Sequence, residues 1–557
     1  MISKNWLITA GFILPVVVYA AGGEESMNRP SAILPTLPSF SPDKTTDSFT
    51  LPIVPETPTP LFQSAESLFV QQITLQGNTV FSADELQFLI QPYQNRRVSI
   101  AELETLRQKI TQHYVDAGYI NSGADIPNDA YQNKLLKIVI IEGKLDEIRI
   151  RGQERLRESY IKNRLLPDID APFNLKALQE NFQSLLADPL ISRMNGRILP
   201  SKTDGGGILD VDVTRAKPYQ LSLLGNNQRP PSIGAEAFGV NGLVRNLTGL
   251  GDSLDFTFFT SDGSKHYSGG ATLPITDSGT QAFFRFDEGN SSVLEENVKK
   301  INIQSEVHSL EGGISQLLLN SMQHKLSIGA SLAVRENKTH LLGKSFSFVQ
   351  GESTGRNQAT VVRTFQDYLW RSEKQAMALR STISFGLNAL DSTPANQQYP
   401  SSEFVAWLGQ AQYAQQVFDD GSQIIFRGNT QLTDRPLLPL ERISVGGMYT
   451  VRGYRENYLV RDEGYSLSAE FHYPLYGSAN EPYRLTFVPF SDLGRAWNLN
   501  DSEPAGTLAS VGAGLNMQVK SLSAELYYGY ALYKKSNSQT GDLQDNGIHF
   551  QMRWDVF

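Results

Sequence analysis

The chain has 557 residues, with 49 Lys and Arg against 58 Asp and Glu, for a formal net charge of −9 at pH 7. This acidic balance argues against a nucleic-acid-binding protein, which would usually present a basic face. The absence of cysteine excludes disulfide scaffolds, thiolate metal sites and cysteine nucleophiles.

Residues 1–20 have the pattern of a secretory signal peptide. Lys4 provides a positive start, and the stretch from Trp6 to Ala20 carries no charge. We expect cleavage after Ala20 or Ala21, because small residues stand there. The alternative, a membrane-anchor helix, would need a longer apolar stretch. No later uncharged run is long enough to span a bilayer, so any membrane-spanning part of the mature chain is expected to be a β-barrel.

Residues 22–66 predict a proline-rich linker, with eight prolines spread among Ser and Thr. Because proline fixes φ and removes a backbone donor, we expect this stretch to be extended and mostly unfolded.

Residues 67–143 predict a small α+β module. Ser82 and Ser99 are each followed three residues later by Glu, in the spacing of a capping box, which predicts two helix starts. Apolar residues at helical spacing continue the second helix to Gly118. Strands are predicted on both sides of the helical pair.

Residues 144–215 repeat this order. Asn174 is predicted to cap a helix, and a strand closes the segment. The repeat is visible in two motifs of the same pattern, Ile73-x-Leu75-x-Gly77 and Ile148-x-Ile150-x-Gly152. Two α+β modules in tandem are therefore expected before the rest of the chain.

Residues 217–557 lose helical periodicity and alternate between apolar and small or polar residues. Strands of about ten residues with one apolar face are typical of a membrane barrel. The soluble alternative, a large β-sandwich or propeller, is disfavoured by the export signal and by aromatic residues at the strand ends. Sixteen candidate strands can be counted, and single-chain bacterial barrels have an even number. We predict a transmembrane β-barrel of 16 antiparallel strands.

No catalytic constellation stands out. The chain has seven His, but no HExxH, Walker or GxSxG motif. We therefore predict that the protein is not an enzyme and uses no cofactor and no metal ion.

Residues 434–463 form an unusually long connection between two predicted strands. Alternation in a later strand predicts that Asp492 faces the lumen, where a carboxylate can bind a guanidinium through two hydrogen bonds. Arg452 would supply that guanidinium if the connection folds inward. The alternative is an exposed Arg and a screened Asp, which contribute little. The two segments carry the motifs Val451-Arg452-Gly453-Tyr454 and Phe490-x-Asp492-x-Gly494.

These motifs, the stretch Asn246-Leu-Thr-Gly-Leu-Gly-Asp252 and the tandem modules make residues 67–557 resemble the haemolysin secretion/activation proteins of Gram-negative bacteria. These are the outer-membrane transporters of two-partner (type V) secretion. The resemblance implies two periplasmic POTRA domains, at 67–143 and 144–215, and a sixteen-stranded barrel at 217–557.

The resemblance also implies that the hairpin 434–463, between strands 11 and 12, folds back into the pore. Arg452 would then lie at its tip and bind Asp492 on strand 13. Gly453 would allow the tight turn, Tyr454 would pack, and Phe490 and Gly494 would complete the wall motif.

The implied function is transport. The POTRA domains would capture an unfolded partner exoprotein (an adhesin, cytolysin or haem-capture protein), and the barrel would thread it to the cell surface without ATP. Some members also activate a haemolysin. We expect a monomer that contacts outer-membrane lipid, is inserted by the barrel-assembly machinery and binds no nucleic acid.

Many members carry an N-terminal plug helix. Prolines interrupt residues 22–45 here, so we expect the hairpin to be the main obstruction. Three alternative functions remain: a barrel-assembly insertase of the same superfamily, which would usually carry more POTRA domains, a solute porin, which would lack them, and a barrel enzyme such as a lipase.

Overall fold

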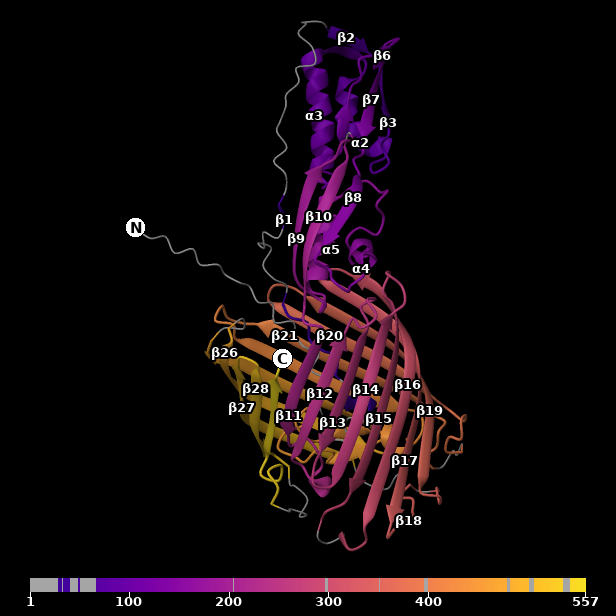
Figure 1. Cartoon of the computed structure of the whole chain (residues 1–557), viewed down its shortest axis with the longest axis vertical. Helices are drawn as coiled ribbons and strands as arrows, with labels where there is room; N and C mark the ends of the chain where they lie inside the picture. The colour runs from indigo at the N-terminus through magenta and orange to yellow at the C-terminus, as the bar shows by residue number, and fades with distance from the viewer. Residues whose placement is uncertain are drawn as a thin grey trace, which may run out of the picture. The chain divides into compact units, whose positions relative to one another are not determined.

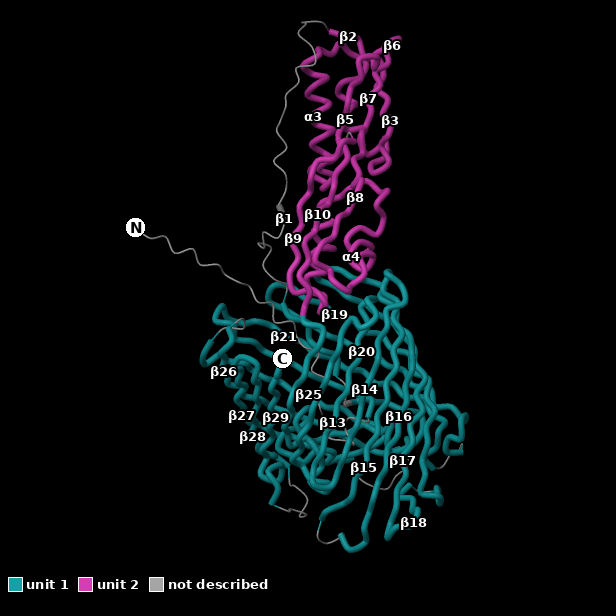
Figure 2. The backbone as a smooth tube through the Cα atoms, viewed as in Figure 1, with its two compact units in different colours: residues 1–43, 217–557 teal, residues 44–216 magenta. Residues whose placement is uncertain are grey.

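The computed structural model describes residues 29–32, 34–40, 49–50, 67–203, 205–295, 299–349, 351–394, 399–477, 481–499, 505–533 and 541–557. The predicted signal peptide lies outside these residues, as does most of the predicted linker. Figure 2 shows two compact units, which we call the modular unit and the barrel unit. The modular unit lies within residues 44–216, and the barrel unit contains residues 217–557 and the described residues before 43.

The first module packs two helices against a sheet in which β7 lies between β3 and β5 (Figure 1). Both predicted capping boxes are confirmed, at Ser82 and Ser99. The second helix ends where Gly118 takes a φ of 102°. The elements are β2 (Ser67–Val70), β3 (Gln72–Gln76), α2 (Ala83–Ile90), η2 (Gln91–Tyr93), β4 (Arg96–Ser99), α3 (Ile100–Asp116), β5 (Gly123–Asp125), β6 (Tyr131–Gln132) and β7 (Leu135–Ile141).

The second module places β10 between β8 and β9. Asn174 caps α5 as predicted, because its side chain accepts the Ala177 N–H. A two-residue strand from the linker, β1 (Phe49–Thr50), pairs in parallel with the outer edge of β9. The module's elements are β8 (Leu145–Arg151), α4 (Glu158–Leu165), α5 (Leu175–Leu186), β9 (Ile191–Pro200) and β10 (Gly207–Arg215).

Sixteen antiparallel strands form a closed barrel, in which each pairs with the next in sequence and β29 pairs back to β11. All sixteen predicted strands are present. The first eight are β11 (Tyr219–Asn226), β12 (Ala237–Arg245), β13 (Ser253–Thr260), β14 (Ser264–Pro274), β15 (Thr280–Ser292), β16 (Ile303–Asn320), β17 (His324–Leu341) and β19 (Arg356–Arg371). The last eight are β20 (Gln375–Leu387), β21 (Val405–Gln416), β22 (Gln423–Thr433), β25 (Glu463–Tyr476), β26 (Tyr483–Trp497), β27 (Gly506–Val519), β28 (Leu522–Ala531) and β29 (Ile548–Asp555).

The barrel wall has an apolar outer face. Along β26, Phe487 and Leu493 are exposed, whereas Val488 and Asp492 are buried. The predicted inward orientation of Asp492 is therefore confirmed. Rows of exposed apolar side chains on alternate residues are typical of strands that face lipid. Within the described residues, no helix is both long enough and apolar enough to cross a bilayer.

The connection between β22 and β25 contains a small hairpin that lies against the inner face of the barrel. Its tip reaches Asp492 on β26, and its base reaches β17 and β19. Its elements are η4 (Pro439–Glu441), β23 (Ile443–Val445) and β24 (Leu459–Arg461).

Residues 29–32 and 34–40 belong to a second non-strand segment packed inside the barrel unit. They begin with the short turn η1 (Pro30–Ala32). The linker prediction does not hold here, because Arg29, Ser31 and Pro35 are buried. Side chains of the barrel unit supply the hydrogen bonds that water would otherwise provide: Gln410 and Gln412 bind backbone carbonyls of this segment.

Candidate functional site

The hairpin tip is shaped by two adjacent glycines and a buried carboxylate. Gly446 and Gly447 take φ values of 116° and 107°, which residues with side chains rarely adopt. The Glu456 carboxylate occupies the space beside Gly447 and accepts the Met448 N–H at 2.7 Å. A Cβ at position 447 would overlap that carboxylate. Glycine at this position therefore lets the Glu456 side chain pack directly against the turn.

Arg452 lies at the hairpin tip and forms a bidentate ion pair with Asp492 on β26. Arg452 Nε donates to one carboxylate oxygen at 2.8 Å, and Nη2 donates to the other at 2.7 Å. The Arg452 backbone N–H also donates to this carboxylate, at 3.0 Å. Both residues are buried. The contact predicted from the two motifs is present in the structure.

Glu470 on β25 completes the charge balance around Arg452. Arg452 Nη1 lies 2.7 Å from a Glu470 oxygen, and Arg427 on β22 pairs with the same oxygen. His472 Nε2 lies 2.7 Å from the other oxygen. Two guanidinium groups therefore face two carboxylates, those of Glu470 and Asp492. Removing one member leaves an uncompensated buried charge, which is strongly destabilising.

Two aromatic rings cover the guanidinium. Arg452 Cζ lies 3.6 Å from the centroid of Phe490 and 4.9 Å from that of Tyr527. A cation over the face of an aromatic ring is attracted by the ring quadrupole, and more strongly where water is excluded. Phe490 therefore contributes directly to holding the arginine.

The other motif residues fix the backbone of the tip. Gly453 has a φ of 90°, and a Cβ there would lie 2.7 Å from the Gly529 carbonyl oxygen. Gly494 leaves room for Val451, whose Cγ2 would lie 2.9 Å from a Cβ at position 494. The Tyr454 hydroxyl donates to a backbone carbonyl of β27 at 3.1 Å. These residues let the tip lie directly on the wall.

A second ion cluster, which the sequence analysis missed, anchors the hairpin base. The buried carboxylate of Glu441 accepts two hydrogen bonds from Arg363 on β19, at 2.8 and 2.7 Å. Arg335 on β17 donates to it at 2.8 Å. The hairpin is thus bound through buried charges at both its tip and its base.

Different signals were available for the two missed carboxylates. Glu470 alternates with Ser466 and Ser468 on the lumen side of a well-patterned strand, so its inward orientation could have been inferred. Glu441 follows a proline-containing turn, and its partners Arg335 and Arg363 lie far away in sequence. No local pattern links those three residues.

The first module contains a partly buried carboxylate network of its own. Glu142 accepts hydrogen bonds from the Thr79 and Val80 N–H groups at 2.8 and 2.9 Å, from the Thr79 hydroxyl, and from the Tyr114 hydroxyl at 2.9 Å. Burial opposes the charged form, but these hydrogen bonds outweigh it and lower the pKa of Glu142 below its usual range. Burial and the bond to Glu142 raise the pKa of Tyr114.

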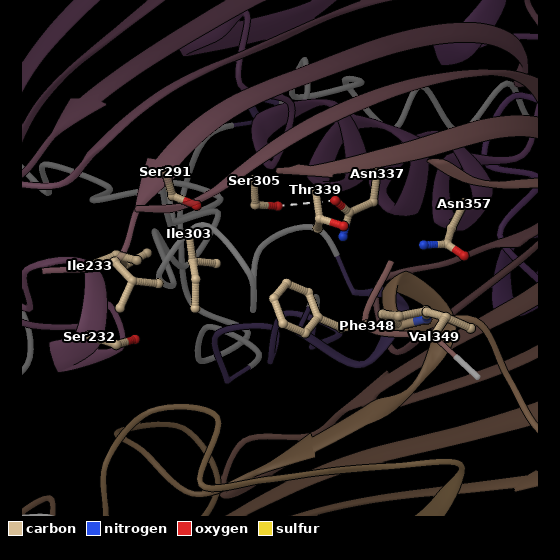
Figure 3. A pocket seen from close by; sticks show the side chains of 12 residues that line it. Ser232, Ile233, Ser291, Ile303, Ser305, Asn337, Thr339, Phe348, Val349 and Asn357 are labelled. Carbon is tan, nitrogen blue, oxygen red and sulfur yellow. Dashed lines mark hydrogen bonds between the residues drawn. The ribbon is translucent and has the colours of Figure 1, made fainter. Parts of the chain in front are cut away.

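A pocket of about 220 Å³ lies beside the hairpin base (Figure 3). Asn337 and Asn357 line it from the wall, Phe348 from a loop and Pro439 from the hairpin. Its lining mixes polar Ser, Thr and Asn side chains with apolar Ile, Val, Phe and Pro side chains. Among the described residues, no group of three or more His, Asp or Glu side chains is placed to bind a metal ion.

Comparison with known proteins identifies this architecture. The model of the haemolysin secretion/activation protein family ShlB/FhaC/HecB matches residues 205–517, and that of the ShlB-type POTRA domain matches residues 68–143. The chain belongs to the haemolysin secretion/activation protein family. It is an outer-membrane transporter of the two-partner secretion type.

Similar curated proteins are transporters. The heme/hemopexin transporter protein HuxB of Haemophilus influenzae (strain Rd) is 22% identical over 470 residues, or 80% of each chain. The outer membrane transporter CdiB of Dickeya dadantii is 21% identical over 486 residues, or 83% of this chain and 82% of CdiB. The hemolysin transporter protein HpmB of Proteus mirabilis is 26% identical over 223 residues, or 39% and 38%.

Solved structures share the fold. CdiB from Escherichia coli superposes with a TM-score of 0.70 at 19% identity, over 90% of this chain and 93% of CdiB. BamA from Haemophilus ducreyi, without its POTRA domains 1–3, gives a TM-score of 0.51 at 12% identity, over 88% and 100%.

Family membership fixes the orientation of the barrel. It spans the outer membrane, and the POTRA domains lie in the periplasm. In such barrels the periplasmic turns are short and the extracellular loops are longer. One rim has short turns, such as 321–323 and 372–374, whereas the other has the connections 388–404 and 434–462. The hairpin therefore enters the lumen from the extracellular side.

Proposed function

We propose that the POTRA domains capture an unfolded partner exoprotein and that the barrel threads it to the cell surface, with the hairpin closing the path at rest. The observation that carries this proposal is the buried ion pair between Arg452 and Asp492, which holds the hairpin against the inner wall. A permanently open solute pore would have no need of such a closure.

Capture in the periplasm is supported by the edge of β9 in the second module. That edge accepts an additional strand, because Phe49 pairs with Gly196 and Thr50 with Arg197. An extended segment of a partner could replace β1 on this edge through the same main-chain hydrogen bonds. The second POTRA domain therefore offers a docking edge for an unfolded chain.

The energy for transport comes from the substrate in this proposal. The periplasm contains no ATP, so directed movement requires another source of free energy. Folding of the partner outside the cell removes the unfolded chain from the exit and prevents its return. The partner is a large exoprotein of the adhesin, cytolysin or haem-capture class. Insertion by the barrel-assembly machinery and a monomeric state remain predictions.

Deletion of residues 67–215 tests capture. The variant is expected to insert as a pore but to secrete nothing, and continued secretion would contradict the proposal. Comparing the secreted and outer-membrane proteins of a strain that lacks the whole gene tests the insertase alternative. Loss of one large secreted protein supports secretion, whereas loss of many barrel proteins supports assembly.

A further inference from the structure

Two glutamines on the inner face of β21 bind the main chain of another segment. Gln412 Nε2 donates to the Pro35 carbonyl at 2.6 Å, and Gln410 Nε2 donates to the Ser31 carbonyl at 3.3 Å. Both glutamines are buried, with 3% and 9% of the surface of Gln410 and Gln412 exposed. Their amides contact backbone atoms, which every polypeptide carries whatever its sequence.

A neighbouring glutamine repeats this mode of binding. Gln431 on β22 lies one strand away and donates to the carbonyls of Glu441 and Asp462 in the hairpin, at 2.9 and 3.0 Å. Three interior glutamines on adjacent strands therefore bind carbonyl groups of non-strand segments. Gln431 binds the hairpin, and the β21 pair binds residues 29–40.

The spacing of the β21 pair matches the spacing of carbonyls in an extended chain. Gln410 and Gln412 are two positions apart on one strand, which corresponds to about 6.6–6.8 Å. In an extended polypeptide, carbonyls two residues apart have the same separation. The carbonyls bound here, of Ser31 and Pro35, are four residues apart in the sequence.

The bound segment also leaves part of the site unused. Gln410 Oε1 is buried and has no hydrogen-bond partner in the described structure. Residues 29–40 contain prolines at positions 30, 35 and 38, which have no N–H to donate. A chain without proline could donate to Gln410 Oε1 while accepting from Gln410 Nε2.

We propose that Gln410 and Gln412 form a binding site for the backbone of an extended polypeptide, which residues 29–40 occupy at rest and the transported chain occupies in transit. This site rests on the proposed function and defines its substrate as any extended, proline-poor segment. The recognition is independent of side chains, which suits the passage of a long exoprotein.

The contacts of Arg29 connect this site to the hairpin. The Arg29 guanidinium donates to the Pro439 carbonyl and, at 3.1 Å, to the Arg442 carbonyl. Pro439 also lines the pocket of Figure 3, to which Ser305 and Asn337 contribute a hydrogen-bonded pair. Departure of residues 29–40 would therefore remove bonds from the hairpin base and clear the space next to an existing cavity at the extracellular end.

Single-channel recording in planar bilayers tests the site without the natural partner. The protein is the full chain lacking residues 29–40, and the probe is a proline-free peptide of 12 residues made of Ser, Thr and Asn. We expect current blockades whose mean duration falls about fivefold for each hydrogen bond lost. Gln412→Leu, which loses one bond, thus shortens blockades about fivefold. Gln410→Leu, which loses the bonds of both Nε2 and Oε1, shortens them about 25-fold, and the double variant shortens them about 125-fold. Gln415→Leu, on the outer face of the same strand, should leave them unchanged.

Unchanged blockades in the double variant would overturn the site. Open-channel conductance and heat-dependent gel mobility show whether each variant is a folded barrel, and if the double variant fails to fold, the single variants decide. Failure of the site is distinguishable from failure of the proposed function. Secretion by cells together with unchanged blockades would reject only the glutamine site, whereas shortened blockades in a protein that secretes nothing would reject only the transport function.

Discussion

Arg452 and Asp492 lie 40 residues apart in the sequence and meet inside the barrel through two side-chain hydrogen bonds and one backbone hydrogen bond. Through the backbone bond, Asp492 holds the hairpin tip in position. Through the side-chain bonds, it compensates the positive charge of Arg452. A bidentate pair of this kind is geometrically specific. The relationship ties the conformation of an extracellular connection to a strand of the wall.

Breaking this pair should impair secretion, because the hairpin tip then loses the contact that returns it to its defined resting position on the wall. Arg452→Ala and Asp492→Ala each leave a buried charge without its partner, at a cost of about 3–5 kcal/mol to the closed arrangement. The double variant should be no worse than either single variant, because it removes both charges of the pair and Arg427 still neutralises Glu470. Secreted partner is measured in culture medium. Fully additive losses would show that the two residues act separately.

Lysine cannot replace Arg452. Lysine keeps the charge but loses the planar fork that binds both oxygens of Asp492. Arg452→Lys should therefore secrete less than the parent but more than Arg452→Ala. Equal secretion by the parent and the lysine variant would show that charge alone is sufficient at this position.

The hairpin base should contribute independently of the tip. Glu441→Gln leaves Arg335 and Arg363 facing a neutral amide, which should weaken the closed arrangement by about 3–5 kcal/mol and raise the frequency of open-channel events. Glu403→Gln is a matched control, because Glu403 pairs with Arg435 at the surface, where an ion pair contributes about 0–1 kcal/mol. Equal frequencies of open-channel events in the two variants would show that the ion cluster at the hairpin base does not hold the hairpin closed.

The strands and the tip contact could be predicted because their signals are local. Alternation of period two located every strand of the wall and placed Asp492 on its inner face. The capping boxes at Ser82 and Ser99 located two helix starts for the same reason: cap and partner are three residues apart. The link between Arg452 and Asp492 came from a family resemblance, together with that inward orientation.

The features that sequence reasoning missed depend on tertiary placement. The strand β9 was overlooked, because two Arg, an Asn and a Gly interrupt its apolar positions. Residues 29–40 were expected in a linker, because their prolines disfavour regular structure. Their buried position depends on Gln410 and Gln412, nearly 400 residues later. No local pattern predicts which carbonyls a distant amide will bind.

The stability of the first module should depend on pH through Glu142. Its pKa is lowered on folding, so its charged form stabilises the module above the unfolded value of about 4.5, and this stabilisation is lost as the pH falls through the folded pKa. Glu142→Gln should cost about 1–2 kcal/mol at pH 7, and the difference from the parent should shrink below pH 4.5.

Hydrogen exchange of α3 in the full-length protein, corrected for intrinsic rates, measures this effect. Asp129→Asn is the control, because Asp129 lies exposed on a turn of the same module. If the difference in α3 protection between Glu142→Gln and the parent stays constant from pH 7 to pH 3, the ionised form of Glu142 does not stabilise the module.

A single engineered disulfide tests the central claim that the hairpin must leave the wall for a polypeptide to pass. Leu459 lies in the hairpin and Gly506 on β27, and a Cβ at position 506 would lie 3.2 Å from Leu459 Cγ, which suits a disulfide. The chain has no cysteine of its own, so Leu459→Cys with Gly506→Cys introduces one defined pair. The measurement is partner secretion by this double variant before and after reduction, beside each single variant. The account predicts that oxidation stops secretion and that reduction restores it. Undiminished secretion with the disulfide formed would contradict the account.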